Sequence, residues 1–164
     1  GQGTMALEIL EQTPDLDAVV VPVGGGGLIA GIGTVMKARK RSVRVIGVEP
    51  TDADAMARSL RAGHRVVLEH VGLFADGVAV KQVGRETFRL CRAHVDEVVL
   101  VSEEEILAHM RLAWERMKLT IEPSAAVGVA VACSAWMRAR QNAGIEDAGV
   151  VLCGGNVDLA ALPF

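Results

Sequence analysis

The sequence predicts an α/β fold in which a mostly parallel sheet is covered by helices on both faces. Short apolar runs rich in valine and isoleucine, such as "AVVVPV" and "VRVIGVEP", have the length and composition of buried strands. Segments in which apolar residues recur at helical spacing lie between these runs. Strands that alternate with helices favour a parallel sheet packed between two helical layers.

The first half of the chain is expected to hold three helices and two strands. Apolar residues from Met5 onward have helical spacing until Pro14 and Asp15 break the pattern. The basic cluster "KARKR" suits the carboxyl end of the second helix, and Gly63 is placed to cap the third. The expected elements are a helix before the "TPDLD" turn, a strand at 18–23, a helix at 28–40, a strand at 43–50 and a helix at 52–62.

The second half begins with residues 64–84, an irregular segment that we interpret as a long functional loop. Ser102 and Glu105 form a Ser-x-x-Glu capping box, and Pro123 opens a helix at a first-turn position, where its missing N–H does no harm. The expected elements are a helix at 85–95, a strand at 96–101, helices at 102–119 and 122–141, and a strand from 149 that leads into a glycine turn.

Composition excludes several classes of function. The net charge is -3 and the basic residues are dispersed, which argues against a nucleic-acid partner. Apolar runs stay below the roughly 18 residues that a membrane span needs, so we expect no membrane partner. Three cysteines without Cys-x-x-Cys spacing argue against a disulfide framework or a zinc ribbon. A cytoplasmic protein is therefore predicted.

Four consecutive glycines, Gly24 to Gly27, separate the first strand from the helix that begins near Leu28. A glycine-rich loop at this place can direct backbone N–H groups at an anion, and the helix N-terminus adds its positive dipole end. Phosphate is the expected ligand, while a turn needed only for tight packing remains the simpler structural alternative. The match to a dinucleotide-binding fingerprint is only partial, because Ile29 occupies the position of its third glycine. Glu49 does stand at the spacing expected for the acid that binds the ribose. A Walker A loop is excluded, since no Gly-Lys-Ser/Thr follows.

Four segments occur in order along the chain: "GGGGL" at 24–28, "LFADGVAVKQVG" at 73–84, "WERMKLTIEPSAAVGVA" at 114–130 and "LCGGNVDL" at 152–159. Together they resemble the serine/threonine dehydratase and serine racemase family, pyridoxal-phosphate enzymes of the tryptophan synthase β-like group. The wording of the second segment is most similar to threonine dehydratases, and that of the third is more similar to serine racemase. The resemblance implies the large-domain fold of this group, with pyridoxal 5'-phosphate as cofactor.

The resemblance also assigns cofactor-binding residues. It implies that Gly24, Gly25, Gly26, Gly27 and Leu28 bind the cofactor phosphate, in agreement with the backbone argument. It places Cys153 beside the pyridine nitrogen, where a neutral thiol, unlike a carboxylate, does not force that nitrogen to stay protonated.

Glu122 is placed by the resemblance at the edge of the site, near the cofactor ring, although a carboxylate also suits the helix start. Asp76 and Gly77 are second-tier candidates near the substrate, since an Asp-Gly pair is also ordinary turn chemistry.

Two elements of the family pattern are missing from this sequence. Some members bind a divalent cation through a Glu, a backbone carbonyl and an Asp; here Glu49 and Ala53 match, but Ala55 replaces the Asp, so we expect no metal. The motif around the lysine that forms the Schiff base is absent, so no catalytic residue is nominated. We therefore expect residues 1–164 to be a single α/β cofactor-binding domain, a fragment of a longer catalytic chain that lacks its N-terminal part.

For the whole enzyme, the resemblance implies β-elimination, the dehydration and deamination of L-threonine or L-serine to a 2-oxo acid and ammonia. The fragment alone is expected to be inactive. A serine racemase is one alternative, and a non-catalytic nucleotide- or phosphate-binding α/β domain is another. The partners implied are a small amino-acid substrate and further copies of the chain, in a homodimer or homotetramer.

Overall fold

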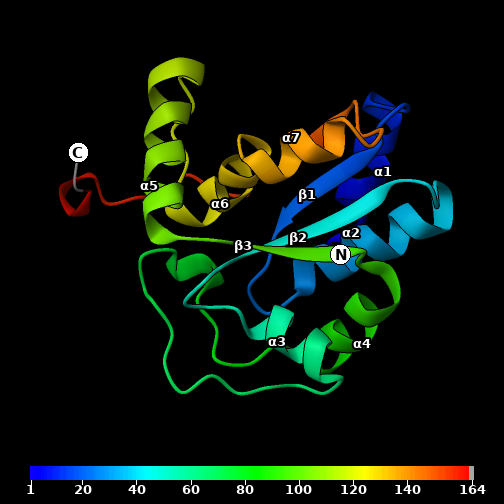
Figure 1. The fold of residues 1–164 in the computed structure, drawn as a ribbon, viewed down its shortest axis with the longest axis horizontal. Coiled ribbons are helices and arrows are strands. Elements are labelled where there is room, and N and C mark those ends of the chain that lie inside the picture. Colours follow the sequence, from blue (N-terminus) through cyan, green and yellow to red (C-terminus); the bar gives the residue numbers. More distant parts are fainter. Residues whose placement is uncertain (163–164) are drawn as a thin grey trace.

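The computed structural model describes residues 1–162, in which four parallel strands form one sheet in the order β3-β2-β1-β4. In the register of the central strand, Val20 pairs with Ile46 on one side and with Val150 on the other. Figure 1 shows the sheet with helices above and below it. The strands are β1 (Ala18–Pro22), β2 (Arg44–Pro50), β3 (Glu97–Val101) and β4 (Ala148–Val150), and the helices are α1 (Gly3–Gln12), α2 (Gly27–Arg39), α3 (Ala55–Ala62), α4 (Arg85–His94), α5 (Glu103–Leu112), α6 (Pro123–Ala132) and α7 (Ala135–Gln141).

Two hydrophobic cores, one on each face of the sheet, confirm the predicted layers. Alternate residues of β1 point to opposite faces: Val20 packs with side chains of α5, α6 and α7, whereas Val19 and Val21 pack with those of α1, α2 and α4. All five residues of β1 are buried, which explains why its sequence is a continuous apolar run without alternation. Within residues 1–162, no helix is both long and apolar enough to cross a membrane.

The predicted helix at 122–141 is divided into α6 and α7. Ala132 is the last residue of α6, and the Ser134 side chain then caps α7 by accepting the N–H of Met137 at 3.2 Å. The predicted helix at 102–119 begins with the expected capping box but is α-helical only to Leu112, followed by a π-helical turn to Met117. Lys118 then adopts a left-handed backbone, with φ of 59°. Segments 64–75 and 79–84 are irregular, as expected, around a single 3-10 turn at Asp76–Val78.

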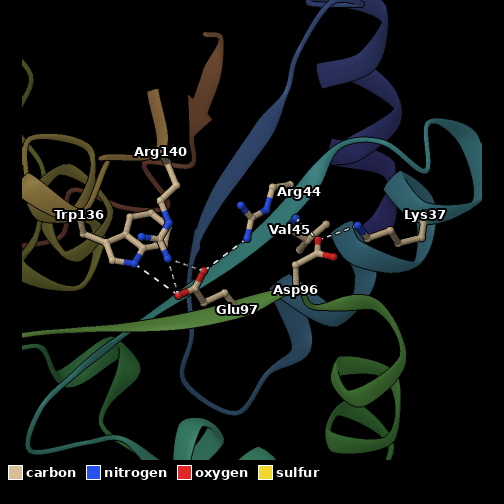
Figure 2. Close-up of polar contacts among 7 residues, drawn as sticks. All are labelled: Lys37, Arg44, Val45, Asp96, Glu97, Trp136 and Arg140. Atoms are coloured by element: carbon tan, nitrogen blue, oxygen red, sulfur yellow. Dashed lines mark hydrogen bonds and ion pairs between the residues drawn. The ribbon is translucent and has the colours of Figure 1, made fainter. Parts of the chain in front are cut away.

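Ion pairs at the amino ends of the strands join the layers (Figure 2). The Glu97 carboxylate lies between Arg44 of β2 and Arg140 of α7, at 3.4 and 3.2 Å, and the Trp136 indole N–H also points at it. Beside it, Asp96 accepts from Lys37 of α2 at 2.6 Å and from the Val45 N–H at 2.7 Å. These contacts tie α2 and α7 to the β2-β3 edge, at the end of the sheet opposite to the glycine loop.

Glu49 is fully buried near the carboxyl end of β2. Its Oε1 and Oε2 accept the N–H groups of Met56 and Ala57, each at 2.8 Å, so this carboxylate satisfies the first turn of α3. Burial raises the pKa of Glu49 to about 7, against the two N–H bonds, which lower it. Both oxygens of Glu49 thus hold the start of α3.

We predict that Glu49→Gln changes how protein stability depends on pH. Because the folded-state pKa lies above the ordinary value of 4.5, the folded state binds the proton more tightly than the unfolded chain. This contribution to stability is present below pH 4.5 and is lost as the pH rises through about 7. Between pH 5 and pH 8 the wild type should therefore lose up to about 3 kcal/mol relative to Glu49→Gln.

Urea unfolding of both proteins at these two pH values measures the difference. Glu86→Gln, which removes an exposed carboxylate on α4, serves as the matched control and should follow the wild type. Parallel pH dependences for the wild type and Glu49→Gln would show that the buried carboxyl does not titrate in this range.

Candidate functional site

The topology brings the chain segments that follow β1 and β4 together. These two strands are parallel neighbours, so both end at the same edge of the sheet. The four glycines follow β1, and Cys153 lies three residues beyond the end of β4. In open α/β sheets this edge is where ligands bind.

A cleft of about 310 Å³ lies at this edge, and we call it the glycine-loop cleft. It contains every cofactor-binding residue predicted from the sequence, together with the second-tier candidate Gly77. Asp76 lines an adjacent hollow with Phe74 and Asn156 instead. The cleft is lined by Pro22, Gly24, Gly25, Gly26, Gly27, Leu28, Gly77, Val78, Glu122, Ser124 and Cys153.

The four glycines have different structural roles. Gly26 caps α2 with a left-handed backbone, φ of 88°, and a side chain on it would meet Met56 and Thr87. A Cβ on Gly24 would lie 3.1 Å from the Cα of Val78. Gly25 and Gly27 have open space where a Cβ would stand, so their backbone is accessible from the cleft. Gly26 and Gly24 are thus required by packing, while Gly25 and Gly27 leave room for a ligand.

The first turn of α2 supplies the polar groups of the loop. The earliest backbone bond of this helix runs from the Ala30 N–H to the Gly26 carbonyl at 3.0 Å, so the N–H groups of Gly27, Leu28 and Ile29 have no partner within the helix. Such a terminus attracts anions through its N–H groups and its dipole.

Glu122 holds the turn that follows Cys153. Its N–H donates to the Gly154 carbonyl, and its Oε2 accepts the Asn156 N–H, both at 3.1 Å. A Cβ on Gly154 would lie 2.5 Å from Oε2, so a larger residue there would displace this carboxylate. Glu122 therefore positions the "CGGN" turn, in addition to lining the cleft.

The thiol of Cys153 is free and resists ionisation. Partial burial of the thiol, followed by the nearby Glu122 carboxylate, raises the pKa of Cys153. Cys153 therefore presents a neutral S–H to the cleft, and this group can donate a hydrogen bond or accept one.

Ser124 is a cleft residue that the sequence analysis missed. It is 1% exposed, lies in the first turn of α6, and its Oγ has no hydrogen-bond partner among the described residues. A buried hydroxyl without a partner costs free energy, which a ligand in the cleft would recover. A signal was present in the sequence, because Ser124 is the one polar residue in the otherwise apolar segment Pro123–Ala132.

Comparison with known proteins finds relatives that match most or all of this chain. The family described as "Pyridoxal-phosphate dependent enzyme" matches residues 1–154. The biosynthetic L-threonine dehydratase of Salmonella typhimurium is 44% identical over 164 residues, which is 100% of this chain and 32% of the relative. The mitochondrial threonine dehydratase of Schizosaccharomyces pombe is 53% identical over 132 residues, covering 79% of this chain and 22% of the relative.

Solved structures show the same similarity in three dimensions. The processed form of threonine deaminase isoform 2 from Solanum lycopersicum superposes with a TM-score of 0.91 and 41% identity, over 98% of this chain and 46% of that chain. Maize serine racemase superposes with a TM-score of 0.93 and 38% identity, over 98% of this chain and 49% of that chain. The chain thus spans about a third or less of these curated relatives and about half of each solved chain. By sequence and by fold, the chain belongs to the family of pyridoxal-phosphate dependent enzymes.

Proposed function

We propose that this chain forms the cofactor-binding part of an enzyme that dehydrates and deaminates L-threonine or L-serine to a 2-oxo acid and ammonia. The observation that carries the proposal is the glycine-loop cleft, in which an anion-binding helix start and a neutral thiol face one space. The 44% identity to a threonine dehydratase over the full 164 residues supports this choice of reaction. We propose further that the chain is part of a longer protein, in which the lysine that forms the Schiff base lies outside this sequence.

The residues of the cleft fit pyridoxal phosphate. The accessible backbone of Gly25 and Gly27 and the N-terminus of α2 suit its phosphate, and the unpartnered Ser124 hydroxyl offers a further polar contact. The Cys153 Sγ keeps its proton, so it gives the ring nitrogen a neutral hydrogen-bond partner. When bound, the cofactor supplies an electron sink for charge that develops at the substrate Cα.

Each of these residues has a defined task in that reaction. The glycine N–H groups bind and orient the phosphate, and Glu122 fixes the turn next to Cys153 through the Asn156 N–H. A neutral partner leaves the electron sink moderate, which favours loss of a β-hydroxyl over long retention of charge on the ring. The side chains of this chain thus hold the cofactor, and we place the proton-transferring lysine elsewhere in the full-length protein.

Serine racemase is the second candidate, and the 38% identity with a TM-score of 0.93 to the maize enzyme favours it. Both reactions begin at the substrate Cα and use the same cofactor-binding half.

We also propose a homodimer or homotetramer in the cytoplasm. The free cysteines Cys91, Cys133 and Cys153 suit a reducing compartment, and exposed Met117 and Leu119 offer apolar surface for association.

Product analysis with the full-length protein tests the reaction. L-threonine should yield 2-oxobutanoate and ammonia, and L-serine should yield pyruvate and ammonia, each measured by chromatography of the 2-oxo acid. Accumulation of D-serine from L-serine, without 2-oxobutanoate from L-threonine, would contradict the dehydratase proposal and support the racemase.

Gly25→Val and Gly26→Val are expected to separate binding from folding. Gly25→Val should raise the Kd for pyridoxal phosphate by about tenfold or more, because the side chain occupies open space beside the phosphate loop, and should leave the Tm of the apo protein unchanged. Gly26→Val should lower the Tm, since φ of 88° disfavours a β-branched residue and its side chain would meet Met56. Cofactor absorbance titrations and thermal unfolding measure the two effects. Unchanged cofactor affinity in Gly25→Val would rule out the phosphate assignment.

Replacement of Cys153 tests the need for a neutral partner. Cys153→Asp should retain cofactor but lower kcat for L-threonine by on the order of tenfold or more, because a carboxylate favours a protonated ring nitrogen. Cys153→Ser, which keeps a neutral donor and acceptor, is the matched control and should stay near the wild-type rate. Steady-state kinetics at equal cofactor content give the comparison, and wild-type turnover in Cys153→Asp would refute the role.

A further inference from the structure

The carbonyl oxygen of Gly25 is held from outside the glycine-loop cleft, by the start of α4. The Thr87 hydroxyl donates to it at 2.6 Å, and the Gly84 N–H donates at 3.2 Å. Thr87 Oγ1 also lies 3.1 Å from the Gly84 carbonyl, but a hydroxyl has one hydrogen, and the shorter contact is the one to Gly25. Segments 62 residues apart are thus joined at one backbone atom of the loop.

This contact fixes the direction of the next N–H group. The peptide bonds of the described chain are all trans, and in a planar trans peptide the C=O and the following N–H point to opposite sides. Because the Gly25 oxygen points toward α4, the Gly26 N–H points away from α4. Rotation of this peptide would turn an oxygen, which repels an anion, toward the place where the loop should present a donor.

Thr87 is also packed closely against the loop, which keeps its hydroxyl next to the Gly25 carbonyl. A Cβ built on Gly26 would lie 3.1 Å from both Cβ and Oγ1 of Thr87, and a Cβ on Gly84 would lie 2.8 Å from Oγ1. The same Cβ position on Gly26 would also lie 2.6 Å from Cε of Met56, whose N–H is bound by the buried Glu49. Glycines on both segments thus let Thr87 reach the Gly25 carbonyl.

We propose that Thr87 is a positioning residue for the phosphate end of the cofactor. Its hydroxyl holds the peptide between Gly25 and Gly26 so that the glycine loop presents N–H groups to the anion. Thr87 acts through the backbone of the loop and is absent from the residues that line the cleft. The inference rests on the assignment of the glycine loop to the cofactor phosphate.

The test compares Thr87→Val, which keeps the shape but removes the donor, with Thr87→Ser, which keeps the donor. Thr34→Val is the matched control, because the Thr34 hydroxyl also donates to a backbone carbonyl, that of Ala30 at 2.7 Å, on the same helix α2. The apo form of the full-length protein is titrated with pyridoxal phosphate and with pyridoxal, which lacks the phosphate, and its Tm is recorded.

Thr87→Val should raise the Kd for pyridoxal phosphate by about tenfold and leave the Kd for pyridoxal unchanged. Its Tm should equal that of the control Thr34→Val. Thr87→Ser should restore the wild-type Kd to within about twofold. Equal weakening of both ligands, failure of Thr87→Ser to restore binding, or a Tm below that of Thr34→Val would overturn the positioning role.

Gly25→Val separates this inference from the assignment on which it rests. If Gly25→Val weakens pyridoxal phosphate but Thr87→Val does not, the phosphate assignment stands and the role of Thr87 is wrong. If neither variant weakens it, the phosphate assignment and the role of Thr87 are both wrong.

Discussion

The left-handed backbone at Gly26 is the constraint on which the rest of the site depends. It turns the chain from β1 directly into α2, and it does so in a space bounded by Met56 and Thr87. Met56 keeps its place because the buried Glu49 binds its N–H, and Thr87 keeps its place because it binds the Gly25 carbonyl. One residue without a side chain therefore links β2, α3 and α4 to the first turn of α2.

The strand order then decides which groups share the cleft. Since β4 adds beside β1, the turn after β4 lies opposite the glycine loop, and Glu122 at the start of α6 fixes that turn through Gly154 and Asn156. The amino ends of the strands instead carry the charged contacts of Glu97 and Asp96, which join α7 and α2 to the sheet. These ion pairs and the glycine-loop cleft are thus at opposite ends of the same sheet.

Much of this arrangement could be predicted from the sequence because its signals are local. Continuous apolar runs identified β1 and β2, and Ser102 with Glu105 identified the start of α5, since both depend on neighbours in the chain. The break between α6 and α7 was missed because the apolar pattern continues across it, although Ser134 is a regular capping residue. The contact of Thr87 with Gly25 could not be predicted, because it joins residues far apart in sequence through a backbone atom. The differing roles of the four glycines likewise depend on neighbours from α3 and α4.

The described residues that line the glycine-loop cleft include one charged side chain, and it is the acid Glu122. A phosphate held there by this chain is bound by backbone dipoles of fixed direction and gains no attraction from a lysine or arginine among those residues. Under the proposed function, the described residues of this cleft would recognise the phosphate by the direction of their hydrogen bonds and not by a cationic side chain.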